Sequence, residues 1–355
     1  MDVTTGMVGH GFYNRNSAPQ MAAIDYVLPW LDRAVAELPL ATGAQTIGIA
    51  DFGCSEGRNS IAVMQRVTQD LRRRTSDPIL TVHSDLPTND FSALFRDLRP
   101  DGQSVFGDDQ ISSCAVGGSM FDQLLPPSSL HLATTFNAIG FLSCRPVARL
   151  PGYILPNGPS HVRANGSVTE DERAIFARQA EDDIASFLEA RANELVPGGK
   201  VLLQVFGADG DQRTCDGIYD ALNDAVLETV EEGVITRDAY EAYYQPVYFR
   251  TLEEILAPVV AGRVPFRIEI SESYTAPVPF NEDFQRTGDV HAYAREYTNF
   301  YRAFTEAVLR LSFPELPDPD GFVTDVYDRA ERLVRSHPDR YPFRYVAVAA
   351  LLTRI

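Results

Sequence analysis

The chain has 355 residues, 45% hydrophobic and 23% charged, which is typical of an ordinary globular protein. Its net charge of −18 argues against a nucleic-acid partner, because phosphates would be repelled. No apolar run approaches the roughly 20 residues that a membrane span needs, so no membrane partner is expected. Four widely spaced cysteines and no apparent signal peptide favour reduced thiols in a cytoplasmic enzyme.

The first predicted elements are a helix over 19–38 and a short buried strand over 46–49. The following sequence A-D-F-G-C-S-E-G-R-N, from Ala50 to Asn59, leads into a helix predicted over 59–74. A strand, a glycine turn and a helix start together form a ligand-binding corner. Glycine lets the backbone approach a ligand closely, and the first helical N–H groups lack partners.

The acidic residue of this corner decides between two cofactors. Asp51 precedes Gly53, whereas the G-x-G-x-x-G dinucleotide fingerprint begins with glycines and places its acid about 20 residues later. Ser55 also stands where a second glycine would be needed. The order suits a ligand without a pyrophosphate, such as S-adenosylmethionine, and an NAD-dependent oxidoreductase is the alternative.

Strands and helices alternate through the first half of the chain, which predicts an α/β fold with a parallel sheet. Further strands are predicted over 80–84, 130–135, 200–206, 266–271 and 345–353, and further helices over 91–99, 169–194, 216–232, 251–260, 291–310 and 322–336. Residues 100–118, rich in Gly, Ser and Asp, are predicted to be a loop. The later helices are expected to form a lid over the carboxyl edge of the sheet, where ligands bind in open α/β folds.

The predicted organisation is a single elaborated domain over 1–355. The core sheet is expected from about 40–145, 195–206, 265–272 and 345–355, and a helical cap from about 146–185 and 207–340.

Two segments beyond the glycine corner fit an adenosine ligand. Asp85 ends the second predicted strand, where a carboxylate can accept hydrogen bonds from both ribose hydroxyls. The segment Gly118-Ser119-Met120-Phe121 follows a predicted loop and can hold the adenine between backbone and apolar side chains.

The motifs then become specific to one family. Phe12 to Gln20 reads F-Y-N-R-N-S-A-P-Q and resembles S-Y-x-x-N-S-x-x-Q, while Asp85 to Phe91 reads D-L-P-T-N-D-F and resembles D-L-P-x-N-D-F. By these motifs the chain is identified as a member of the SABATH family of S-adenosylmethionine-dependent carboxyl methyltransferases, along nearly its whole length. The resemblance implies a Rossmann-like class I methyltransferase sheet with a helical lid, and points to a bacterial member.

The resemblance also implies the residues of the site. With Asp51 of the glycine corner, the cofactor site is expected to comprise Tyr13, Ser17, Gly53, Cys54, Asn59, Asp85, Leu86, Ser119, Met120 and Thr135. Gln20 is expected to donate its amide N–H to the substrate carboxylate. The substrate site is expected to comprise Tyr13, Gln20, Gly140 and Phe141.

One departure from the family bears on the substrate. Where the family has the Trp of L-H-W-L-S, which gives a second N–H to the carboxylate, this chain has Phe141, and Gly140 precedes it. The lost donor and the missing side chain favour a longer, apolar acid, with a fatty acid as the preferred substrate. An aromatic acid of the salicylate or benzoate type, or a ring nitrogen, is the alternative.

The expected reaction is in-line transfer of the methyl group to the acid, giving a methyl ester and S-adenosylhomocysteine. A carboxylate is already ionised near pH 7, so no general base is expected, and rate comes from alignment and exclusion of water. A non-catalytic S-adenosylmethionine-binding protein is a further alternative, favoured by the missing Trp and opposed by Gln20 and Tyr13.

Other polar residues have simpler interpretations. Cys54 is interpreted as small packing in the turn, and the acidic cluster Glu181-Asp182-Asp183 as a solvated helix face, so no metal is expected. His10 lies between two glycines near Tyr13, where contact with the pocket stays open. Assembly as a homodimer also stays open.

Overall fold

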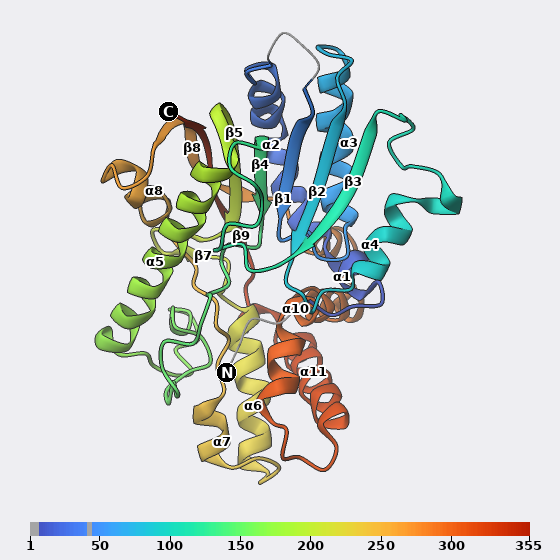
Figure 1. Cartoon of the computed structure of the whole chain (residues 1–355). Helices are drawn as coiled ribbons and strands as arrows, with labels where there is room; N and C mark the ends of the chain where they lie inside the picture. Colours follow the sequence, from blue (N-terminus) through green and yellow to red (C-terminus); the bar gives the residue numbers. More distant parts are fainter. Residues whose placement is uncertain (1–6, 41–44) are drawn as a thin grey trace.

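The computed structural model describes residues 7–40 and 45–355 (Figure 1). Its strands are β1 (Ile47–Phe52), β2 (Ile79–Asp85), β3 (Ile111–Gly117), β4 (Leu130–Phe136), β5 (Leu195–Phe206), β6 (Ala208–Asp209), β7 (Gln212–Arg213), β8 (Phe266–Ala276) and β9 (Tyr345–Arg354). Its α-helices are α1 (Phe12–Asn16), α2 (Ala18–Ala36), α3 (Arg58–Arg72), α4 (Phe91–Leu98), α5 (Glu170–Glu194), α6 (Ile218–Glu231), α7 (Arg237–Ala242), α8 (Leu252–Val260), α9 (Pro279–Thr287), α10 (Val290–Ser312) and α11 (Pro319–Ser336).

The main sheet has the order β3-β2-β1-β4-β5-β9-β8. Strands β1 to β5 pair in parallel, and β9 runs antiparallel between β5 and β8. Every residue of β1 and β4 is buried, as expected for central strands covered on both faces. The strand order reverses between these two strands, and such a switch point is where open α/β sheets bind ligands.

Helices cover both faces of the sheet (Figure 1). On one face, α2 packs against α3 and contacts strands β5, β8 and β9. On the other face, α5 and α8 pack against each other, and α5 contacts β5 while α8 contacts β8. Both α8 and part of α5 fall within the ranges expected to form the cap, yet they contact the sheet. The division into one domain with that cap therefore stays a prediction.

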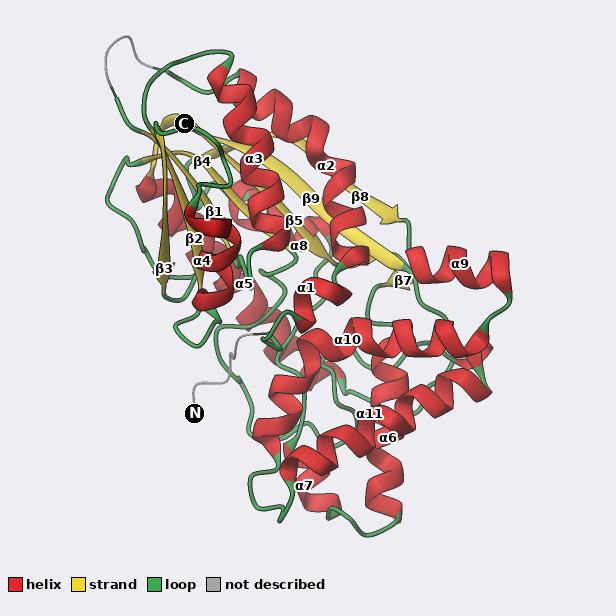
Figure 2. Cartoon of the chain, turned by 90° about the vertical axis from the view of Figure 1, so that its right-hand side faces the viewer, coloured by secondary structure: helices red, strands yellow, loops and turns green. Residues whose placement is uncertain are grey.

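A second helical layer lies beyond the carboxyl ends of the parallel strands (Figures 1 and 2). Helix α10 packs against α9 and α11, and α11 against α6. The aromatic residues of α10 fill much of this layer, where Tyr297 and Tyr301 are buried and Phe300 contacts the ring of Phe343. This arrangement places the expected lid helices next to the switch point.

The prediction of a loop over residues 100–118 is wrong for its second half. Residues Ile111–Gly117 form β3, which pairs with β2 from Ile79↔Ile111 to Asp85↔Gly117. β3 is an edge strand, and most of its residues are only partly buried. Its sequence, I-S-S-C-A-V-G, therefore lacks the continuous apolar run by which a central strand is recognised.

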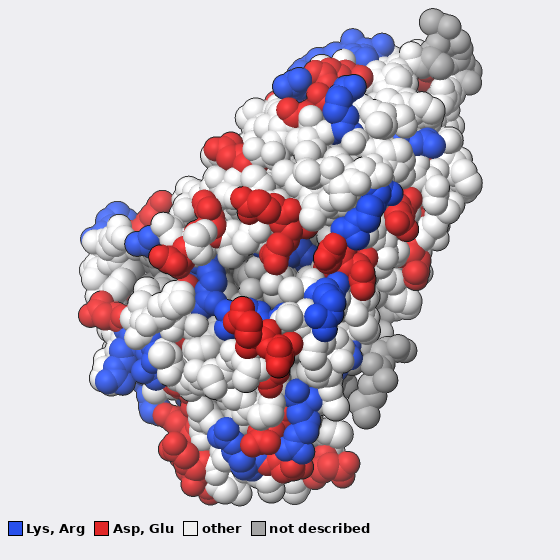
Figure 3. All heavy atoms as spheres, turned by 90° about the vertical axis from the view of Figure 1, so that its left-hand side faces the viewer, with Lys and Arg blue, Asp and Glu red and all other residues white. Residues whose placement is uncertain are grey.

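The surface shown in Figure 3 carries acidic and basic side chains in alternation, with no large area of one charge on that face. Among the helices of the described part of the chain, none combines the length and the apolar character needed to cross a bilayer.

Candidate functional site

Three cavities adjoin one another at the switch point. The edge cavity is lined by Asp85, Leu86, Ser119, Met120 and Phe121 among others, and has an empty volume of about 680 Å³ that includes open solvent. The turn cavity is lined by Asp51, Gly53, Cys54 and Asn59, and the aromatic cavity by Gln20, Phe206, Phe249 and Phe300, each with further residues. Tyr13 and Asn137 line all three, so the cavities adjoin one another at these two residues.

The turn after β1 is as tight as the glycine motif predicts. Gly53 has φ 91°, and a Cβ atom there would lie 2.2 Å from the Cβ of Ala138. Asp51 is 3% exposed and accepts a hydrogen bond from the Thr134 hydroxyl at 2.8 Å. Burial raises the pKa of Asp51 to about 6. Burial also raises the pKa of the Cys54 thiol well above its ordinary value, which disfavours the thiolate that a nucleophile needs.

The carboxylate of Asp85 is held at the end of β2. Its two oxygens accept the backbone N–H groups of Ser55 and Leu86, each at 2.7 Å. Burial raises the pKa of Asp85, so the free site carries an incompletely compensated acid. Each carboxylate oxygen keeps a further lone pair, and Asp85 can therefore accept two more donors from a ligand in the edge cavity.

The edge cavity also has polar atoms that await a partner. The Ser55 and Ser84 hydroxyls line it, are buried, and have no hydrogen-bond partner among the described residues. Buried hydroxyls are normally paired, so two unpaired ones in residues that line this cavity suit a polar ligand. With Asp85 they offer the mixed donor and acceptor set that a nucleoside requires.

The aromatic cavity is apolar along most of its wall. Phe206, Phe249, Phe300, Phe304 and Ile218 line it. Gln20, from the first turn of α2, also faces this space, and its buried Oε1 has no partner in the described part of the chain. Met7, Tyr13, Asn137 and Phe141 line both this and the edge cavity, so the two cavities lie side by side.

Comparison with known proteins shows which family the chain belongs to. Residues 3–355 match the family model described as "SAM dependent carboxyl methyltransferase". The chain belongs to this SABATH family. Salicylate carboxymethyltransferase of Clarkia breweri is 26% identical over 98% of this chain and 96% of its own, and probable jasmonic acid carboxyl methyltransferase 1 of Theobroma cacao is 25% identical over 98% and 96%. A solved structure of loganic acid methyltransferase with SAH has a TM-score of 0.78 at 21% identity, covering 99% of this chain and 98% of that one.

Family membership settles the broader sequence predictions. The protein is an S-adenosylmethionine-dependent carboxyl methyltransferase with a Rossmann-like class I methyltransferase fold. S-adenosylmethionine, rather than NAD, is the cofactor. When bound, it supplies a methyl group on a sulfonium, which is already a good leaving group. The methyltransferase has only to orient the acid and exclude water, for which a closed, largely apolar cavity next to the cofactor site is suited.

Some residues predicted from the family motifs do not line these cavities. Ser17 and Thr135 are buried beside the site, and neither lines any of the three cavities. At Gly140 a Cβ atom would lie 2.2 Å from the Phe206 ring. That ring occupies the space of the missing side chain, so the expectation of a wider pocket at Gly140 is not met. His10 is exposed and lines none of the three cavities either.

Glu56, to which the sequence motifs assign no role, holds the N-terminal segment of the methyltransferase over the turn. Its buried carboxylate accepts the backbone N–H of Gly11 at 2.5 Å and of Asn14 at 3.2 Å. Arg58 adds a hydrogen bond to the Asn14 carbonyl at 2.6 Å. These contacts place Tyr13 against all three cavities. The sequence signal for this role was a glutamate between the two turn glycines. Its partners could not be identified from the motif, because they lie more than 40 residues away in the chain.

A buried ion pair supports the loop that follows β3, and the sequence motifs assigned it no role. Arg191 and Glu194 are fully buried and pair at 2.7 Å. Arg191 donates to the Met120 carbonyl at 2.9 Å, and Glu194 accepts the N–H groups of Leu124 and Leu125. The pair therefore fixes the loop that carries Met120 into the edge cavity.

The predicted solvated face at 181–183 is wrong for Asp183. This residue is buried and accepts hydrogen bonds from the Ser143 N–H at 2.9 Å and the Ser143 hydroxyl at 2.6 Å. Glu181 is exposed and pairs with Arg263. The periodicity of a long helix did not reveal Asp183 as inward-facing, because its partner lies in a loop 40 residues earlier.

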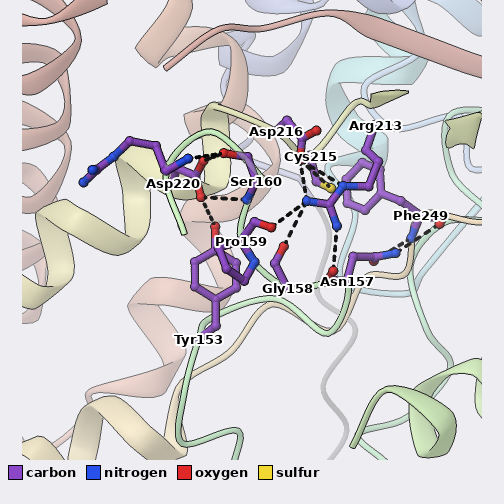
Figure 4. Close-up of polar contacts among 11 residues, drawn as sticks. Tyr153, Asn157, Gly158, Pro159, Ser160, Arg213, Cys215, Asp216, Asp220 and Phe249 are labelled. Carbon is purple, nitrogen blue, oxygen red and sulfur yellow. Dashed lines mark hydrogen bonds and ion pairs between the residues drawn. The ribbon is translucent and has the colours of Figure 1, made fainter. Parts of the chain in front are cut away.

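A second polar network braces the loop beside the aromatic cavity (Figure 4). Arg213 donates to the Asn157 carbonyl at 2.7 Å, and Asp220 accepts from the Tyr153 hydroxyl at 2.7 Å. Ile218 lies between these two anchors in the chain and lines the cavity. The network thus holds a wall of the cavity in place.

Proposed function

We propose that this enzyme converts a hydrophobic monocarboxylic acid, preferably a fatty acid, to its methyl ester. The observation that carries the proposal is the lining of the aromatic cavity. The residues that line it without also lining the edge cavity are mainly Phe and Ile, and the polar ones are uncharged. The Thr214 hydroxyl is already used, since it donates to the Val346 carbonyl and accepts the Val346 N–H. An acid with a second charged group would lose its hydration without gaining a partner.

Within this proposal, Gln20 donates its amide N–H to the carboxylate at the junction with the edge cavity. Asp85 accepts the ribose hydroxyls of the cofactor, while Leu86, Ser119 and Met120 contact its adenine. Asp51 and Asn59 face the amino-acid end of the cofactor in the turn cavity. The charge of Asp51 suits the amino group there.

A product assay by mass spectrometry tests the substrate class. The enzyme is given S-adenosylmethionine with salicylate, benzoate, indole-acetate or saturated fatty acids of increasing length. Fatty acid methyl esters are the expected main products. Preferential methylation of an aromatic acid would instead overturn the proposal, and so would methylation of a ring nitrogen. Gln20→Ala should raise KM for the acid while leaving cofactor affinity nearly unchanged.

A further inference from the structure

Asn137 occupies the junction of the three cavities. It is the first residue after β4, is 6% exposed, and lines the edge, turn and aromatic cavities. Its φ of 58° is left-handed, a conformation that asparagine tolerates better than most residues. The backbone N–H is fixed to the Gln204 carbonyl at 2.8 Å. The side chain therefore leaves the sheet edge from a defined position.

Hydrogen bonds determine which end of the Asn137 amide faces the cavities. Its Oδ1 accepts the Tyr345 hydroxyl at 2.6 Å and the Gln204 Nε2 at 3.1 Å. These two donors use both lone pairs of the oxygen. Across residues 7–40 and 45–355, Nδ2 donates no hydrogen bond. Its two N–H groups are thus left for whatever occupies the site.

We propose that Asn137 Nδ2 donates a hydrogen bond to the substrate carboxylate, beside the one from Gln20. Both amides line the aromatic cavity, and Phe141, which also lines it, has no N–H to offer. A carboxylate buried there requires more than one donor to offset its lost hydration. This inference rests on the proposed function, and it makes Asn137 a carboxylate-binding residue rather than a brace for Tyr345 and Gln204.

Asn137→Asp separates these two roles. The new carboxylate keeps an acceptor for Tyr345 and Gln204 and tolerates the left-handed backbone, but it presents an oxygen where Nδ2 stood. Binding of octanoate and of its neutral amide, octanamide, is measured by calorimetry with saturating S-adenosylhomocysteine, whose sulfur is uncharged. Octanoate should bind about tenfold or more weakly to the variant, because a charged hydrogen bond is replaced by repulsion. Octanamide should bind within about twofold of wild type or more tightly, since its N–H groups can donate to the new acid.

Several outcomes would overturn the inference. One is an octanoate affinity of Asn137→Asp equal to that of wild type. Another is an equal loss of affinity for octanoate and octanamide, which a purely structural role of Asn137 would give. If Asn137→Asp does not fold, Asn137→Gly replaces it, because glycine keeps the left-handed backbone and removes the donor. Wild-type octanoate affinity in Asn137→Gly would then contradict the proposed contact. Asn223→Asp is the matched control, because Asn223 also accepts a tyrosine hydroxyl, that of Tyr240 at 2.7 Å, but lines none of the three cavities.

The wild-type arm separates failure of this inference from failure of the proposed function. A wild-type enzyme that neither binds nor methylates octanoate or any longer saturated fatty acid contradicts the proposed function and removes the basis for the Asn137 contact. A wild-type enzyme that methylates octanoate while Asn137→Asp binds it normally contradicts the Asn137 contact alone.

Discussion

Asp51 and Thr134 lie directly opposite each other on the adjacent parallel strands β1 and β4, and the Thr134 hydroxyl donates to the Asp51 carboxylate at 2.8 Å. Burial outweighs the hydrogen bonds from the side chains of Ser60 and Thr134, and the pKa of Asp51 is raised to about 6. The carboxyl group is therefore largely neutral below that pH in the free enzyme. A cationic ligand beside it favours the ionised form and lowers the pKa again.

The first prediction is that cofactor binding weakens on acidification. In the proposed binding mode the ionised form of Asp51 binds the cofactor amino group, so the Kd for S-adenosylmethionine should rise below about pH 6, by up to about tenfold per pH unit. Calorimetric titrations between about pH 5 and pH 7.5 measure this slope. Asp51→Asn should bind more weakly and with a flatter profile.

The pKa of Asp85 is also raised by burial, so it provides the comparison. If Asp51→Asn retains the full slope and Asp85→Asn loses it, then Asp85 is the titrating group and the assignment to Asp51 is wrong.

The second prediction concerns the N-terminal segment. Glu56→Gln keeps one acceptor oxygen but exchanges the other for a donor that faces a backbone N–H, of Gly11 or of Asn14. Losing a charge-assisted hydrogen bond should loosen residues 7–16 and weaken cofactor and acid binding together, by about tenfold. Limited proteolysis should cut this segment faster, and bound S-adenosylhomocysteine should protect it less.

Glu181→Gln is the control for this variant, since Glu181 has an exposed ion pair far along the chain. Unchanged proteolysis in Glu56→Gln would show that the segment is held by other contacts.

The third prediction tests the buried pair of Arg191 and Glu194, which supports the loop that follows β3. Arg191→Met leaves Glu194 buried without its cation and should cost about 3–5 kcal/mol in the free energy of unfolding. The double variant Arg191→Met with Glu194→Met removes both charges and should recover part of that stability. It should still bind S-adenosylmethionine weakly, because the Met120 carbonyl and the N–H groups of Leu124 and Leu125 lose their partners.

Denaturant unfolding and calorimetry separate these effects. A double variant with wild-type cofactor affinity would mean that the loop holds its position without the pair.

The sequence was most informative where the structure of a segment depends on residues within that same short segment. The central strands β1 and β4 are short, largely apolar and fully buried, and the Gly53 turn is specified by local conformation, so both could be predicted. Gln20, Asp85 and Ser119 line the cavities as expected, although their contacts with ligands remain predictions. Edge strand β3 was missed because its half-exposed residues show no hydrophobic period.

The missed residues depend on partners distant in the chain. Asn137 acquires its orientation from Tyr345, which lies 208 residues later, and Glu56 acquires its role from Gly11. The Phe206 ring fills the space beside Gly140, and only packing between β5 and the loop after β4 reveals this. Family motifs identify positions one at a time, whereas these relationships arise from the folded arrangement.

The last prediction follows from the charge balance of the site. The residues lining the aromatic cavity, within the described ranges, include no Lys, Arg or His, while the Asp85 and Asp51 carboxylates line the edge and turn cavities proposed to hold the cofactor. A substrate carboxylate therefore finds its positive partner in the cofactor sulfonium. Octanoate should bind about tenfold more tightly with sinefungin, which carries an amine near the position of the transferable methyl, than with uncharged S-adenosylhomocysteine. By linkage, octanoate should tighten sinefungin binding by the same factor, which calorimetry in both orders of addition can check. Octanamide should show no such preference, and equal octanoate affinity in the two complexes would mean that the protein's own neutral donors are sufficient to hold the acid.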